Sequence, residues 1–150
     1  MFRGNHQYSV DDKGRVAIPA RFREALSGLQ DERLVVTNFK RRGRPCLDVH
    51  PLSGWQRFLE KVGAQKRFSP RIAAFEDWYV GGAHDVQVDA QGRILVPHIL
   101  REYAKLEREV IFAGVSDRFR IWNKDLFHQV HSENEREVFE DPTLLEDLGL

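Results

Sequence analysis

The chain has 150 residues, 41% of them hydrophobic, and its 23 Lys and Arg residues balance its 23 Asp and Glu residues. This size predicts one compact domain or two very small fused ones, and the single Cys46 excludes an internal disulfide and a thiolate zinc site. We expect a cytoplasmic protein, because the N-terminus lacks an apolar signal region and no apolar run approaches the roughly 20 residues that span a membrane.

The balanced total hides charges that are segregated along the chain. Residues 1–75 hold 15 basic and 7 acidic residues, a net charge of +8, whereas residues 76–150 hold 8 basic and 16 acidic residues, a net charge of −8. A basic half favours an anionic partner such as nucleic acid. Residues 133–150 carry seven acidic residues against one arginine, which predicts a frayed helix or a disordered tail.

The sequence contains an internal repeat. Residues 9–24 (SVDDKGRVAIPARFRE) and 87–102 (QVDAQGRILVPHILRE) share seven of sixteen positions. Such self-similarity at a fixed offset indicates a duplicated unit. Each copy predicts the element order ββαββα.

In the first copy, a short strand enters the turn at residues 11–15 (Asp-Asp-Lys-Gly-Arg), and an alternating strand with Val16 and Ile18 leaves it. We therefore expect a hairpin. Pro19 then suits the first turn of a short helix, whose apolar positions are Phe22, Ala25 and Leu26. Strands at 33–39 and 46–50 follow. Next comes a helix with Ser53 as its capping residue and an apolar face at Trp55, Phe58, Leu59 and Val62.

Between the copies, Ser69 and Pro70 predict the start of a connecting helix, which the glycines at 81–82 end. Its apolar face comprises Ile72, Phe75 and Tyr79. The second copy then repeats the order, with a turn at 89–93, strands at 109–115 and 118–122, and a last helix capped by Asn123. Its matching apolar positions are Ile94, Val96, Leu100, Tyr103, Ala104, Phe127 and Val130.

A single Asp-x-x-Gly-Arg turn is weak evidence, but two of them, each followed by aliphatic-x-aliphatic-Pro, are specific. With these turns the sequence resembles the MraZ family of bacterial transcription regulators, which belong to the AbrB and SpoVT superfamily of swapped-hairpin barrels. The resemblance covers residues 1 to about 131. It rests on Met1-Phe2-Arg3-Gly4, residues 11–15 with Pro19, residues 89–93 with Pro97, Leu100-Arg101-Glu102-Tyr103-Ala104 and Phe119-Arg120-Ile121-Trp122.

The resemblance implies an α+β fold of two tandem AbrB-like ββαββα repeats, which form one pseudo-symmetric β-barrel unit with flanking helices. We place repeat 1 at residues 5–53, the connecting helices at 54–80, repeat 2 at 81–125, and a C-terminal helix with the acidic tail at 126–150.

The resemblance also implies a repressor that acts at the promoter of the division and cell-wall gene cluster. Such a protein binds repeated boxes of double-stranded DNA as a ring-shaped homo-oligomer, in the cytoplasm and at the nucleoid. It needs no cofactor, metal, membrane or small-molecule substrate and is not an enzyme.

By position, the resemblance makes Arg15 the principal DNA contact, with Lys13 and Gly14 beside it. Asp11 is then the structural partner of Arg15. In the second copy the matching residues are Asp89, Gly92 and Arg93, but Gln91 replaces Lys13.

The chemistry of these residue types fits that role. An arginine can form two hydrogen bonds to guanine in the major groove, whereas lysine mainly contacts phosphates. We therefore expect Arg15 to read sequence while other basic residues position the protein on the backbone, namely Lys13, Arg3, Arg21 and Arg23. A second basic run is either a solvated loop or a phosphate-contacting one, and consists of Lys40, Arg41, Arg42 and Arg44.

Two other functions compete with this interpretation. One is an antitoxin-like protein-interaction module with secondary DNA binding, in which the acidic tail neutralises a protein partner. The other is a small hydrolase or metal-dependent enzyme that uses His128, His131 and Glu133. The sequence contains neither an HExxH nor a G-x-S-x-G motif, which disfavours the enzyme.

Overall fold

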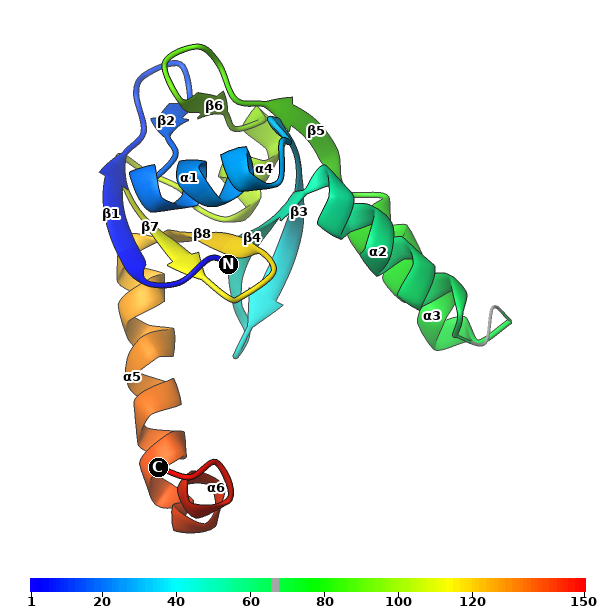
Figure 1. The fold of residues 1–150 in the computed structure, drawn as a ribbon, viewed down its shortest axis with the longest axis vertical. Coiled ribbons are helices and arrows are strands. Elements are labelled where there is room, and N and C mark those ends of the chain that lie inside the picture. Colours follow the sequence, from blue (N-terminus) through cyan, green and yellow to red (C-terminus); the bar gives the residue numbers. More distant parts are fainter. Residues whose placement is uncertain (66–67) are drawn as a thin grey trace.

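The computed structural model describes residues 1–65 and 68–150, which form an α+β fold as expected (Figure 1). The strands are β1 (Asn5–Ser9), β2 (Arg15–Ala17), β3 (Arg33–Arg41), β4 (Arg44–Pro51), β5 (His84–Gln87), β6 (Arg93–Leu95), β7 (Glu109–Gly114) and β8 (Phe119–Asn123). The helices are α1 (Ala20–Gly28), α2 (Leu52–Gly63), α3 (Pro70–Phe75), the π-helical turn η1 (Glu76–Val80), α4 (His98–Tyr103), α5 (Lys124–Glu140) and α6 (Pro142–Asp147).

The strands form two antiparallel sheets. Six of them make one sheet in the order β1-β7-β8-β4-β3-β5, and β2 and β6 pair separately. The alternating and β-branched segments correctly predicted four of these strands, β3, β4, β7 and β8.

The expected hairpin at each Asp-x-x-Gly-Arg turn is wrong. β1 pairs with β7 of the second copy instead of with β2, and β5 pairs reciprocally with β3 of the first copy. β2 pairs with β6, which sets Val16 opposite Ile94. The two copies exchange strands because a unit of about 45 residues is too small to close a core of its own.

The main core lies between the inner face of the six-stranded sheet and the layer formed by β2, β6, α1 and α4 (Figure 1). Alternation along each strand selects the residues, so that Val36 and Phe112 enter this core while their neighbours Val35 and Ile111 face the other side. The predicted helix residues Phe22, Leu26, Leu100 and Ala104 are buried here.

The outer face of the sheet is covered by two separate groups of helices. α5 packs Phe127 and Val130 against Ile111 and Trp122. α2, α3 and η1 form an arm that leaves the body near β3 and β5 (Figure 1). Trp55 and Tyr79 anchor this arm on Val35.

Capping was predicted correctly at one of the two helices that follow the sheet strands. Asn123 precedes α5, and its side chain accepts a hydrogen bond of 3.1 Å from Leu126 N. Ser53, however, lies inside α2, which begins at Leu52 after Pro51. The backbone amide of Ser53 instead donates to the carboxylate of Asp31 at 3.2 Å, so a carboxylate from another segment takes the role expected of the local serine.

The connecting helix begins at Pro70 and ends at Val80, just before Gly81, as the sequence predicts. Its last five residues adopt a π-helical turn. Residues 66–67, which fall within the predicted connecting segment, lie outside the described residues. Among the described residues, no helix is long and apolar enough to cross a bilayer.

The expected fraying or disorder of the acidic tail is wrong. α5 continues to Glu140, and Asp141 caps α6 by accepting a hydrogen bond of 3.2 Å from Leu144 N. Part of the reason is electrostatic, because the Glu133 carboxylate binds the guanidinium of Arg44 on β4. Two of the acidic side chains, Glu133 and Glu137, thus have basic partners in the fold.

Candidate nucleic-acid interface

The pairing of β2 with β6 brings the two Asp-x-x-Gly-Arg turns together at one end of the molecule, and α5 extends from the opposite end (Figure 1). Two backbone hydrogen bonds join the turns across the copies. Val96 N donates to Gly14 O at 3.0 Å, and Ile18 N donates to Gly92 O at 2.9 Å. Turns that lie 78 residues apart in the sequence therefore form a single surface.

Asp11 organises the first turn. Its Oδ1 accepts hydrogen bonds from the backbone amides of Lys13 and Arg15, each at 2.9 Å, and its Oδ2 accepts one from Arg15 Nε at 2.9 Å. Arg15 keeps about a third of its side chain exposed, at 35%. Because the bond to Asp11 uses Nε, the terminal nitrogens of the guanidinium stay available to a ligand.

The second turn repeats this geometry. Asp89 Oδ1 accepts from the amides of Gln91 and Arg93 at 2.8 and 2.9 Å, and Oδ2 accepts from Arg93 Nε at 3.2 Å. The exposed fraction of the Arg93 side chain, 31%, is close to that of Arg15. The two turns thus present two oriented guanidinium groups of the same kind.

The pKa of each aspartate is lowered in this setting. The backbone amide of Arg15 lowers the pKa of Asp11, and the amide of Arg93 lowers the pKa of Asp89. A hydrogen bond to the charged form favours that form. Both carboxylates are therefore ionised at neutral pH, which is the state that holds each arginine in place.

The two turn glycines are packed against arginine side chains. Gly14 and Gly92 adopt positive φ angles of 87° and 76°, but both are buried. Arg101 of α4 covers Gly14, and Arg23 of α1 covers Gly92. The missing side chains at these two positions make room for the arginines of α4 and α1.

The remaining basic residues predicted as phosphate contacts do not gather at the turns as a group. Lys13 is exposed on the first turn and Arg23 lies at the second. Arg3 and Arg21 are exposed and line another hollow together with Glu24. Arg3 follows Phe2, whose backbone pairs with Ser116 beside β7.

The basic run at residues 40–44 lies at the tip of β3 and β4, next to α5. Arg44 forms a two-pronged ion pair with Glu133 at 2.8 and 2.9 Å. Arg42 Nε donates to Asn134 Oδ1 at 2.7 Å, and its Nη2 also contacts Glu137. Two of these cations thus have protein partners, whereas Lys40 and Arg41 are exposed.

The residues of the competing enzyme hypothesis have other contacts. Arg44 binds both carboxylate oxygens of Glu133 and lowers its pKa, and the ring of His131 stacks on Phe127 with centroids 5.3 Å apart. Within residues 1–65 and 68–150, no three His, Cys, Asp or Glu side chains are grouped as metal ligands would be.

Sequence reasoning did not select Arg101 as a site residue. The repeat contained the signal, because Arg101 occupies the position in the second copy that Arg23 occupies in the first. Its role depends on the strand exchange between copies, since Arg101 reaches the turn of the first copy instead of the turn in its own.

Comparison of the sequence with known proteins points to one family. A family model described as "MraZ protein, putative antitoxin-like" matches residues 1–76 and 79–145. Three relatives bear the name "Transcriptional regulator MraZ". The protein of Pelotomaculum thermopropionicum is 44% identical over 126 residues, 83% of this chain and 81% of the relative. The protein of Acidithiobacillus ferrooxidans is 38% identical over 125 residues, 82% of this chain and 83% of the relative.

The third relative, from Thermoanaerobacter sp. (strain X514), is 36% identical over 150 residues, which is the full length of both chains. The similarity therefore extends across the whole sequence, including both turns and the C-terminal helices. The chain belongs to the MraZ family.

Proposed function

We propose that this protein is a transcriptional regulator that binds double-stranded DNA in a sequence-specific manner through its paired Asp-x-x-Gly-Arg turns. The observation that carries the proposal is the side-by-side placement of two turns, each of which holds an arginine by a carboxylate and leaves its guanidinium partly exposed. The relatives named as transcriptional regulators support this role.

In this proposal Arg15 and Arg93 read base edges, because a guanidinium can bond guanine O6 and N7 at once in the major groove. Lys13 contacts phosphate from the first turn. Asp11 and Asp89 do not contact DNA but orient the arginines. Arg3, Arg21 and Arg23 are proposed as further phosphate contacts, together with the exposed Lys40 and Arg41.

The finer features implied by the resemblance are part of the same proposal. We propose two AbrB-like repeats in one barrel unit, and a ring of identical subunits that binds repeated boxes at the promoter of the division and cell-wall genes as a repressor. The reciprocal pairings of β1 with β7 and β3 with β5 support the repeats. A ring suits repeated boxes, since linked weak contacts gain avidity.

The site assignment is tested by Arg15→Ala. We expect the variant to fold normally, because a partly exposed turn arginine contributes little to stability. We expect it to lose about five- to 150-fold in affinity for a promoter fragment, since a base contact is worth roughly 1–3 kcal/mol. Fluorescence anisotropy with DNA fragments selected from the organism's own genome measures this. Near-normal affinity would refute the assignment. Arg108→Ala, a change of the same charge at an exposed site, is the control.

A second candidate function is an antitoxin-like module that binds a protein through its C-terminal helices. The observation in its favour is that α5, α6 and the residue after α6 expose apolar side chains among many carboxylates. These apolar side chains are Phe139, Leu144 and Leu148. Deletion of residues 141–150 separates the two functions. Loss of a protein partner supports the second, whereas unchanged operator binding is the outcome expected from the first.

A further inference from the structure

Each turn is in contact with a helix of the opposite copy. Arg101 of α4 covers Gly14 of the first turn, and Arg23 of α1 covers Gly92 of the second. A Cβ atom built on Gly14 would lie 2.6 Å from Arg101 Nε, and one built on Gly92 would lie 2.6 Å from Arg23 Nη1. A methyl group at either position would therefore displace the arginine that covers it.

We infer that Arg101 and Arg23 are positioning residues that lock each turn against the other copy, so that both turns meet duplex DNA as one unit. The part that concerns DNA rests on the proposed function. The lock itself does not rest on that function, because it concerns only which arginine stabilises which turn.

The lock is most complete at Arg101. Its Nε donates a hydrogen bond of 3.0 Å to the carbonyl of Val96, and the amide of Val96 donates a bond of 3.0 Å to Gly14 O. Val96 of the second copy therefore binds both the guanidinium of Arg101 and the turn of the first copy. Movement of the turn requires either this backbone bond or the packing of Arg101 on Gly14 to break.

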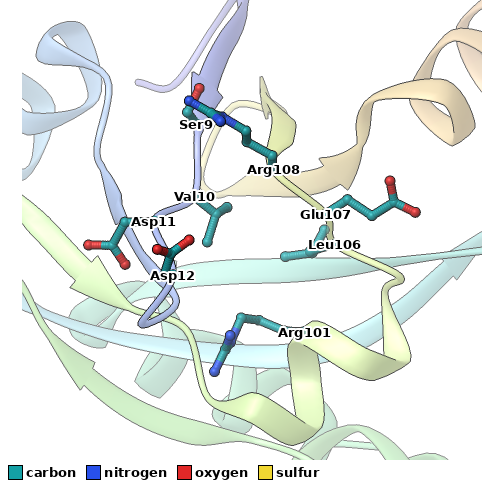
Figure 2. Close-up of a pocket in the computed structure, with 8 residues that line it drawn as sticks. All are labelled: Ser9, Val10, Asp11, Asp12, Arg101, Leu106, Glu107 and Arg108. Atoms are coloured by element: carbon teal, nitrogen blue, oxygen red, sulfur yellow. The ribbon is translucent and has the colours of Figure 1, made fainter.

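The cavity beside Arg101 does not by itself explain why an arginine stands at this position. Figure 2 shows Arg101 extending from α4 toward the loop that carries Asp11 and Asp12. Three carboxylates line the cavity, those of Asp11, Asp12 and Glu107, against the guanidiniums of Arg101 and Arg108. This charge balance disfavours a small anion as the occupant. The contact of Arg101 with the turn is thus the better account of its placement.

The shape of the side chain matters as much as its charge. A guanidinium is planar and can lie flat over a glycine while Nε donates to a carbonyl, whereas a lysine ammonium is a compact point charge on a flexible stem. Lysine should therefore replace Arg101 poorly if the role is positioning. It should replace Arg101 well if the role is only to attract phosphate.

The lock is tested by hydrogen exchange of the full-length protein, measured segment by segment. We expect Arg101→Met to accelerate exchange about tenfold in residues 11–15 of the first turn and to leave residues 89–93 unchanged, because removal of the lock permits local opening. Arg23→Met should have the reverse pattern. Arg108→Met, a neighbouring change that uncovers no glycine, is the matched control and should alter neither turn.

The effect of the lock on DNA binding is tested by measuring affinity for the same promoter fragment. Arg101→Met should weaken sequence-specific binding about tenfold, and Arg101→Lys should not restore it although the charge is retained. Full rescue by lysine would overturn the positioning role. If Arg101→Met accelerated exchange in residues 89–93 instead of residues 11–15, or in neither turn, the lock would be overturned. If the unaltered protein fails to bind the DNA while the exchange pattern holds, the proposed function fails and the lock stands.

Discussion

We expect Asp11 to affect DNA binding in a way that its charge alone would not predict. Its Oδ2 accepts from Arg15 Nε, and its Oδ1 accepts from two backbone amides. Removal of a negative charge from a surface that binds an anion should strengthen binding if only the charge mattered. If Asp11 orients Arg15, the same change should weaken binding.

We therefore predict that Asp11→Asn lowers affinity for a promoter fragment several-fold. Asparagine has only one acceptor oxygen, and its NH2 group cannot accept, so it cannot bind both the backbone amides and Arg15 Nε. Anisotropy titrations measure the effect. Asp12→Asn removes the same charge one residue further along the chain and should bind equally well or more tightly. If both variants bind more tightly than the unaltered protein, Asp11 does not position Arg15.

Lys13 is the residue at which the two turns differ, since Gln91 takes its place in the second. If Lys13 contacts phosphate, Lys13→Gln should weaken binding to all sequences alike and reduce the slope of log affinity against log salt by about one. The reciprocal change, Gln91→Lys, should steepen the slope by a similar amount. A change in preference between sequences, with no change in slope, would show that Lys13 reads bases.

At the scale of the elements, a buried network attaches the helical arm to the sheet. The hydroxyl of Tyr79 donates to Asp48 Oδ2 at 2.6 Å, so His50 Nε2, 2.8 Å from that hydroxyl, must donate to it. Arg120 Nε donates to the second oxygen of Asp48 at 2.8 Å. Thr37 Oγ1 binds the backbone carbonyl of Tyr79 at 2.5 Å. The π-helical turn is thus held by side chains of β3 and β4, and Arg120 of β8 binds the aspartate that holds it.

This network makes stability depend on pH. Burial lowers the pKa of His50 from 6.5 to about 4. Between these values the unfolded chain binds a proton that the folded chain does not. Stability is therefore fully present above pH 6.5 and declines by roughly 3 kcal/mol as the pH falls to about 4. Urea unfolding over this range measures it.

His50→Gln, which retains a donor for Tyr79, should remove most of this dependence. His84→Gln, at an exposed histidine of β5, should leave it unchanged. An unaltered pH slope in the His50 variant would show that the histidine does not cause it.

The elements themselves were largely predictable from local patterns. Alternating apolar residues located β3, β4, β7 and β8, and Asn123 marked the start of α5. The errors arose where tertiary contacts decide the outcome. Asp31, distant in sequence, replaced the expected cap at Ser53, and Arg44 supplied a partner for the acidic α5. A pattern within one segment contains no information about such partners.

At the scale of the whole molecule, the exchange of strands between copies produces the candidate site. The sequence predicted the two turns, their aspartate–arginine contacts and their repeated spacing. It did not predict that β2 would pair with β6, or that Arg101 would cover Gly14. These features depend on how two incomplete units close around each other, which the repeat indicates only in part.

We propose that the paired turns, at the end opposite α5, form the surface that meets DNA. Because Cys46 is fully buried, a cleaving iron chelate can be attached selectively to a cysteine introduced by Asp12→Cys, Ala90→Cys or Thr143→Cys. We expect DNA cleavage at sites within or beside the bound boxes from positions 12 and 90, and none from position 143 on α6. Cleavage from position 143, with none from the turns while binding is intact, would contradict it.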